Sequence, residues 1–140
     1  MIYMTSSVVP VVGNAERSLM RVNDPAITEK MMRALTDSGM RKVLNATVVS
    51  PKSAAALSEE LGIPIRSIYR YISDLSELGL LTSEQTMLID SGGKYLLYRS
   101  MVKQVGIAYD SEKNVFNVDI VPNENILGKF MRFWTYMGGN

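Results

Sequence analysis

The spacing of apolar and polar positions predicts four helices in the first half of the chain, after an N-terminal stretch without a clear period. Helical spacing begins near Pro25, where a proline suits the first turn and Asp24 can cap the helix. Gly39 is expected to separate this helix from a second one over residues 40–48. The apolar positions that share the inner faces of these two helices are Ile27, Met31, Met32, Leu35, Val43, Leu44 and Thr47.

A short helix and a longer helix follow, joined by very few residues. Ser53 can cap a helix over residues 54–61, and Gly62 stops it. The next helix is expected over residues 64–78, with Gly79 at its end. Its inner face consists of the apolar residues Ile65, Ile68, Ile72 and Leu75, at spacings of three and four. Two helices joined by so short a turn cross at a steep angle, which is the geometry of a helix-turn-helix.

The second half of the chain has the period of strands and predicts two hairpins. The expected strand pairs are residues 80–89 with 94–99 and residues 104–109 with 115–121. Pro122 ends the last strand, and Asn123 can cap a final helix that continues to about residue 137. In the N-terminal stretch only residues 8–12 have the character of a short strand. We therefore expect mainly α structure with small antiparallel β (an α+β fold): a winged helix-turn-helix with an added β-hairpin and terminal helices.

The expected elements divide the chain into three parts. Residues 1–25 form an N-terminal arm, residues 26–100 form the winged helix-turn-helix domain, and residues 101–140 form a β-hairpin plus a C-terminal helix for dimerisation. A chain of 140 residues has room for a single core. It has no room for separate cofactor and substrate domains.

The helix-turn-helix segment and the strand after it resemble ArsR-like winged helix-turn-helix transcription regulators, of the non-metal-sensing kind common in archaea. The residues that carry the resemblance, at the family's spacing and without gaps, are Ala54, Leu57, Leu61, Gly62, Ile63, Pro64, Ser67, Ile68, Arg70, Tyr71, Ile72, Leu75, Gly79, Leu80 and Leu81. Upstream, residues 35–44 are similar to the family's preceding helix, so the resemblance covers roughly residues 35–100. The family's metal sensors use Cys and His ligands that have no counterparts here. Tyr69 and Tyr71 replace the usual small Ser and His, so the base preference should differ.

The amino-acid composition excludes several classes of function. The chain has no Cys and no His, which excludes disulfides, thiolate nucleophiles, Ser-His-Asp triads and nearly all zinc or haem ligation. With no phosphate-binding glycine loop either, we expect no enzyme activity, no cofactor and no metal. No apolar run reaches membrane-spanning length and the N-terminus does not resemble a signal peptide, so we expect a cytoplasmic protein without a membrane partner.

The charge balance is unusual for a protein that binds DNA. The whole chain carries 15 basic and 14 acidic side chains, a net charge of +1. Residues 36–100 carry seven of each sign, so non-specific attraction to DNA should be weak. Glu59 and Glu60 are expected to point outward on their helix, which would keep acidic charge off the contact face.

In a winged helix the second helix of the pair enters the major groove with its N-terminal end first. The candidate DNA contacts are Lys52, Ser53, Arg66, Ser67, Tyr69, Arg70, Ser73 and Lys94. Arg66 and Arg70 lie four residues apart and repel each other unless a phosphate or a guanine edge lies between them. The alternative for this face is a solvated helix surface with Arg70 paired to Asp74. For Lys94 in the expected wing, the alternative is a lysine that any hairpin can carry at its turn. For Ser53, the alternative is a helix cap that needs no ligand.

The apolar stripe of the terminal helix is larger than a small winged helix can cover. The candidate dimer interface is Met31, Met32, Leu35, Leu127, Phe130, Met131 and Trp134. The alternative is that the stripe packs onto the second hairpin of its own chain. The sequence thus predicts a homodimer that binds double-stranded DNA and regulates transcription. A winged helix that contacts a protein partner in transcription or replication machinery remains open. RNA binding by the wing and Tyr95 or Tyr98 has no specific sign. The sequence does not say whether the protein has a small-molecule effector.

Overall fold

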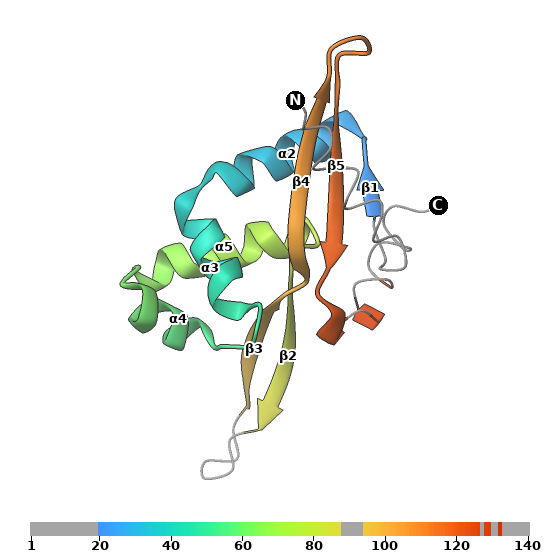
Figure 1. Cartoon of the computed structure of the whole chain (residues 1–140). Helices are drawn as coiled ribbons and strands as arrows, with labels where there is room; N and C mark the ends of the chain where they lie inside the picture. Colours follow the sequence, from blue (N-terminus) through green and yellow to red (C-terminus); the bar gives the residue numbers. More distant parts are fainter. Residues whose placement is uncertain (1–19, 88–93, 127, 130–131, 133–140) are drawn as a thin grey trace.

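A computed structural model describes residues 20–87, 94–126, 128–129 and 132, and its fold is α+β (Figure 1). The elements in chain order are β1 (Met20–Val22), α2 (Pro25–Thr36), α3 (Ser38–Thr47), α4 (Ala54–Leu61), α5 (Ile65–Glu77), β2 (Leu81–Met87), β3 (Lys94–Ser100), β4 (Val102–Asp110), β5 (Val115–Pro122) and the 3-10 helix η1 (Glu124–Ile126). The strands form a two-stranded sheet, β2-β3, and a three-stranded sheet with the order β1-β5-β4.

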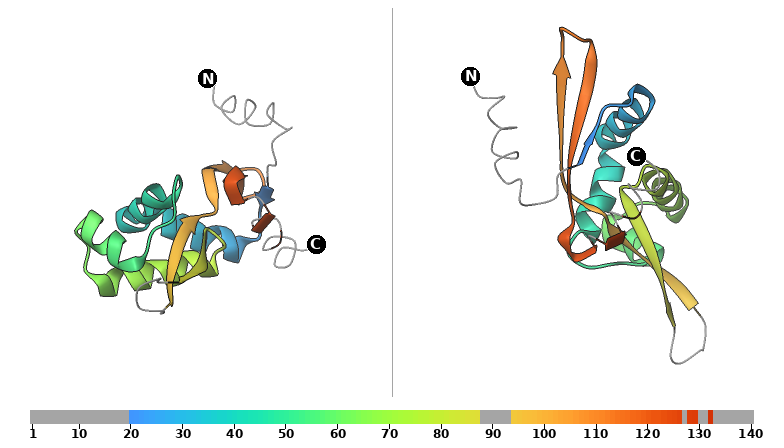
Figure 2. Two further views of the ribbon diagram at one scale, coloured as in Figure 1. Left: turned by 90° about the horizontal axis from the view of Figure 1, so that it is seen from below. Right: turned by 90° about the vertical axis from the view of Figure 1, so that its right-hand side faces the viewer.

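The arrangement of α3, α4, α5 and the β2–β3 hairpin is that of a winged helix, as predicted. The two strands of this wing pair without a bulge from Leu81 opposite Ser100 to Met87 opposite Lys94. A short backbone bridge between Lys52 and Tyr98 adds the segment before α4 to the edge of β3. The wing and the β4–β5 hairpin extend in opposite directions from the helices, as the right-hand view of Figure 2 also shows.

Most helix ends follow the expected local chemistry. The Asp24 carboxylate accepts hydrogen bonds from two backbone N–H groups of the first turn of α2, and Ser53 Oγ accepts one from the backbone of Ala56. Gly62 ends α4 in the left-handed conformation, with φ of 66°. The separation of α2 from α3 is different from the prediction, because Asp37 rather than Gly39 lies between them and caps α3.

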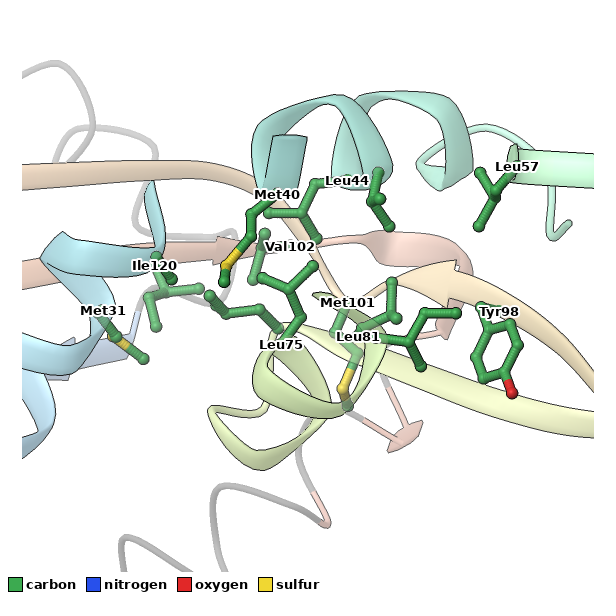
Figure 3. Packing of buried hydrophobic residues seen from close by; sticks show 14 of the residues in the cluster. Met31, Met40, Leu44, Leu57, Leu75, Leu81, Tyr98, Met101, Val102 and Ile120 are labelled. Atoms are coloured by element: carbon green, nitrogen blue, oxygen red, sulfur yellow. The ribbon is translucent and has the colours of Figure 1, made fainter. Parts of the chain in front are cut away.

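One core joins the helices to both hairpins (Figure 3). Helix α5 buries Ile68, Ile72 and Leu75, as predicted. The prediction was wrong for Ile65, whose side chain is 43% exposed. This residue is the first of α5 and lies at the edge of the helix face that is buried. In the view of Figure 3, Met31 and Ile120 lie toward one end of the core and Leu57 and Tyr98 toward the other.

The inner face of α2 is rotated relative to the prediction. Met31 is fully buried, as expected, but its buried neighbours are Thr28 and Ala34. The other three expected core residues of this helix are only half-buried: Ile27, Met32 and Leu35. On α3 the prediction is confirmed, since Val43, Leu44 and Thr47 are buried.

Strand β1 lies in a stretch where the sequence predicts no regular element. It pairs antiparallel with β5, and Arg21 lies directly opposite Asp119. The guanidinium donates two hydrogen bonds to this carboxylate, at 2.6 and 2.8 Å. Asp119 is buried, so the paired arginine neutralises a charge that would otherwise be costly there. The same hydrogen bond raises the pKa of Arg21 above its ordinary value.

The wing continues into the second hairpin through a short junction, residues 100–102. Ser100 Oγ donates to the carbonyl of Val102 and accepts from its N–H, and the Met101 N–H donates to the carbonyl of Leu80. The buried Asn123 closes the junction, because its side-chain amide donates to the carbonyls of Ser100 and Val48 at 3.0 and 2.9 Å. Asn123 therefore connects the end of α3 to the strand that joins the wing and the hairpin.

The predicted strand at residues 8–12, the wing turn at residues 90–93 and most of the predicted terminal helix lie outside the described residues. Asn123 was expected to cap that helix, and its side-chain carbonyl oxygen accepts a hydrogen bond from the backbone of Asn125 in η1. Within the described ranges, no helix is both long and apolar enough to cross a membrane.

We predict that Asn123→Ala lowers the free energy of unfolding by about 1–3 kcal/mol, because it leaves the carbonyls of Val48 and Ser100 without their donor. Urea denaturation of the wild type and the variant measures the difference. The control is Asn45→Ala, which removes an exposed amide from α3. Equal destabilisation by both substitutions would show that the junction contributes nothing particular.

Candidate nucleic-acid interface

The turn between α4 and α5 is closed by one small side chain. Ser58 Oγ donates a 2.6 Å hydrogen bond to the carbonyl of Ile63, and the Ser58 carbonyl accepts from the N–H groups of Gly62 and Ile63. Pro64 then precedes the first turn of α5 in an extended conformation. These contacts hold the two helices of the helix-turn-helix at a fixed angle and leave the outer face of α5 free of other described elements.

The outer face of α5 carries the central candidates of the sequence analysis. Arg66, Tyr69, Arg70 and Ser73 are exposed, and Ser67 is half-buried at its side. The structure therefore brings five of the eight candidate contacts together on one helix. Both arginines lie in the N-terminal half.

The charge along α5 changes sign from one end to the other. The basic side chains lie in its first two turns, whereas Asp74 and Glu77 occupy its last turns. A phosphate backbone is attracted to the first half and repelled by the second. This polarity favours an approach to DNA with the N-terminal end of the helix first.

Arg70 is held by an aromatic ring rather than by the predicted acidic partner. Its guanidinium lies over the ring of Tyr71, 5.0 Å from the centroid, and no ion pair in the described part of the chain joins Arg70 to Asp74. The Tyr71 ring in turn packs against Gly39 of α3, where an added Cβ would lie 2.5 Å from a ring carbon. Gly39 thus makes room for the ring that positions Arg70, a role that differs from the helix break predicted at this glycine.

Lys52 and Ser53 have partners within the protein. Lys52 Nζ contacts both carboxylate oxygens of Glu60, at 2.8 and 2.9 Å. Glu60 was expected to keep its charge away from the contact face, but it lies beside a candidate contact and compensates the charge of Lys52. Ser53 acts as the cap of α4, as its alternative reading had it. The side chain of the wing residue Lys94 lies outside what the structure describes.

Tyr98 belongs to strand β3 of the wing and lies near enough to Tyr69 of α5 to interact with it electrostatically. Its ring is buried, and its backbone N–H and carbonyl exchange hydrogen bonds of 2.7 and 2.9 Å with Lys52. Burial, together with the neighbouring hydroxyl of Tyr69, raises the pKa of Tyr98 above its ordinary value of 10.0. The sequence offered Tyr98 only as a possible RNA contact, and it could not predict the contact with Lys52, which joins two segments far apart in the chain.

The candidate dimer interface is only partly visible. Met31 has no exposed surface and packs inside its own chain, so it cannot contribute directly to an outer surface, whereas Met32 and Leu35 keep some exposed area. The four candidates on the predicted terminal helix lie outside the described residues: Leu127, Phe130, Met131 and Trp134.

Two surface hollows lie away from this interface. One, of about 300 Å³, is lined by charged side chains of α2 and α5, among them Lys30, Arg33, Asp74 and Glu77. The other, of about 380 Å³, lies between the start of α2 and the β4–β5 turn. Neither contains any of the eight candidate contacts. In the part of the chain that the structure describes, no three His, Cys, Asp or Glu side chains gather as metal ligands.

Comparison with known proteins gives one informative similarity. The chain is 30% identical over 92 residues to an uncharacterized HTH-type transcriptional regulator of Haemophilus influenzae. The match covers 66% of this chain and 41% of the relative, so it spans about two fifths of the length of that protein. No family model matches the chain. The similarity supports a helix-turn-helix regulator in general and does not distinguish between subtypes.

We predict that Tyr98 makes folding stability fall more steeply with alkaline pH. Above pH 10 the unfolded chain loses this proton while the folded chain keeps it, so the stabilisation present below pH 10 is lost as the pH rises through the folded-state pKa. Urea denaturation at a series of pH values from 9 up to the alkaline limit of folding measures the free energy of unfolding. This free energy should fall less steeply with pH in Tyr98→Phe than in the wild type. Tyr109→Phe, which removes an exposed hydroxyl from the other hairpin, is the control. Identical declines in the wild type and Tyr98→Phe would contradict the prediction.

Proposed function

We propose that this protein is a sequence-specific DNA-binding transcription regulator, with α5 as its recognition helix and the β2–β3 wing on the backbone or in the minor groove. The observation that carries the proposal is the exposed pair Arg66 and Arg70 on the N-terminal half of the second helix of a helix-turn-helix. Bidentate guanidinium groups at this position can bind guanine edges or phosphates. The similarity to an HTH-type transcriptional regulator supports the same function.

The finer parts of the proposal rest on the sequence. The ungapped pattern from Ala54 to Leu81 supports an ArsR-like subtype, and the absence of Cys and His fits a member that does not sense metals. The apolar stripe of the predicted terminal helix supports a homodimer. One winged helix with balanced charge has little affinity of its own, so two copies on neighbouring half-sites would compensate for weak electrostatic attraction.

A protein partner is the second candidate, because α5 exposes apolar as well as basic groups. Ile65 and Tyr69 are 43% and 54% exposed beside the two arginines. Such a mixed surface also occurs in protein interfaces, where tyrosine and arginine are enriched. The DNA proposal is favoured because both arginines cluster at the end of the helix that a winged helix inserts into the groove.

We predict that Arg66→Ala and Arg70→Ala each weaken binding to a selected duplex by about 1–3 kcal/mol and leave the fold intact. The site is first selected from a random duplex pool, and affinities are then measured at several salt concentrations. For a dimer with about four phosphate contacts per subunit, log K should fall with log salt at a slope of about −7 in the wild type. Lys113→Ala, at the exposed turn of the other hairpin, is the charge-matched control. Unchanged affinity in both arginine variants would favour the protein partner.

We also predict that the protein forms a dimer through the helix that the sequence predicts near residue 134. Trp134→Ala should then dissociate the subunits and also weaken binding to a palindrome. Binding weakens because only a dimer holds two recognition helices at half-sites about 34–36 Å apart. Light scattering at tens of micromolar measures the mass, and binding to a palindrome and to a single half-site is compared in parallel. A wild-type protein that stays monomeric at this concentration would contradict the dimer, whatever the variant does.

A further inference from the structure

Exposed apolar side chains gather along one side of α5, next to the wing. Ile65 and Tyr69 lie one helical turn apart and are 43% and 54% exposed. Leu96, 40% exposed, lies on the same face of β3 as Tyr98, the tyrosine near Tyr69. Three of the six large hydrophobic residues that the described part of the chain exposes therefore lie around the recognition helix and the wing.

These side chains form a row beside the arginines. Residues four apart lie on the same side of a helix, so Ile65 and Tyr69 make one row, and Arg66 and Arg70 make the next. Core packing does not explain the apolar row, because other residues of α5 form its buried face. A ligand of this surface has to offer apolar groups immediately beside anionic or acceptor groups.

The major groove of a DNA duplex offers that combination. The 5-methyl group of thymine is its apolar group, and guanine N7 and O6 together with the phosphates are acceptors for arginine. We propose that Ile65 and Tyr69 recognise thymine 5-methyl groups, while the adjacent Arg66 and Arg70 bind guanine edges or phosphates. The inference rests on the proposed function and names the bases that this helix reads. Ile65 and Tyr69 are thus specificity-determining residues.

The geometry of the helix also indicates the spacing of the bases. Four residues of an α-helix rise about 6 Å, and successive base pairs are about 3.4 Å apart. Where the helix axis follows the groove, Ile65 and Tyr69 contact thymines about two base steps apart. The selected sites should contain such a pair of thymines in each half-site.

Replacement of thymine by deoxyuridine tests the inference, because it removes the methyl group and keeps every hydrogen-bonding atom. Each thymine of the selected site is replaced in turn, and binding is measured with the wild type, Ile65→Ala and Tyr69→Ala. One buried methyl group corresponds to about a fourfold change in affinity. The matched controls are Ile107→Ala and Tyr109→Ala on the other hairpin, since these residues are 42% and 53% exposed. Deoxyuridine placed outside the footprint controls for changes in the duplex.

We expect one or two replacements in each half-site to weaken wild-type binding about fourfold. The replacement at one thymine should have almost no effect on Ile65→Ala, and the replacement at the other should have almost none on Tyr69→Ala, whereas both hairpin variants should behave as the wild type. A wild-type protein that binds its site but tolerates every replacement would overturn the inference and leave the proposed function standing. An equal penalty in all variants would assign the methyl contacts to other residues and would overturn it as well. A protein that selects no duplex at all would overturn the proposed function itself.

Discussion

The burial of one face of α5 determines what the rest of the molecule can do. Ile68, Ile72 and Leu75 pack into the core that the helices share with both hairpins, and this fixes the rotation of the helix about its axis. Burying such side chains is worth about 1.5–3 kcal/mol each, so a rotated helix would lose several kcal/mol. Because the rotation is fixed, Arg66 and Arg70 have to point outward. The same packing that stabilises the fold thus presents the surface that we assign to DNA.

A second constraint is the junction between the wing and the β4–β5 hairpin. Only one residue separates strand β3 from strand β4. The side chain of Asn123 hydrogen-bonds to Ser100, the last residue of β3, and to Val48 at the end of α3. The wing is therefore anchored at its base through the polypeptide backbone and through a buried amide. Tyr98 and its bridge to Lys52 hold the wing close to the start of α4. These contacts fix the base of the wing relative to the helices.

Features that depend on local chemistry could be predicted from the sequence. Asp24 and Ser53 act as helix caps, Gly62 stops a helix in the left-handed conformation, and both hairpins have the expected order. On α5 the spacing of apolar residues predicted the buried face except at its first residue. At Ile65 the apolar spacing continues, but no core residues lie near enough to cover the side chain.

Features that depend on contacts between distant segments could not be predicted. Strand β1 has only three residues, and its pairing with β5 is secured by an ion pair across 98 positions of the chain. A glycine at position 39 predicts a helix break, but in the structure Gly39 lies inside α3 and leaves space for the ring of Tyr71. The ion pair between Lys52 and Glu60 was also not predicted, since no local pattern marks either residue as the partner of the other. This pair reduces the positive charge that Lys52 contributes to the candidate site.

The central claim is that α5 enters the major groove, and chemical interference at guanine N7 tests it most directly. Dimethyl sulfate methylates guanine N7 in the major groove and adenine N3 in the minor groove, so one reagent distinguishes the two faces of the duplex. Duplexes carrying the selected site are methylated sparsely, bound by the protein, separated into bound and free fractions, and mapped. The account predicts that N7-methylated guanines within each half-site are depleted from the bound fraction in the wild type. Bound duplexes that tolerate N7 methylation throughout the site, and are depleted only of N3-methylated adenines, would contradict it.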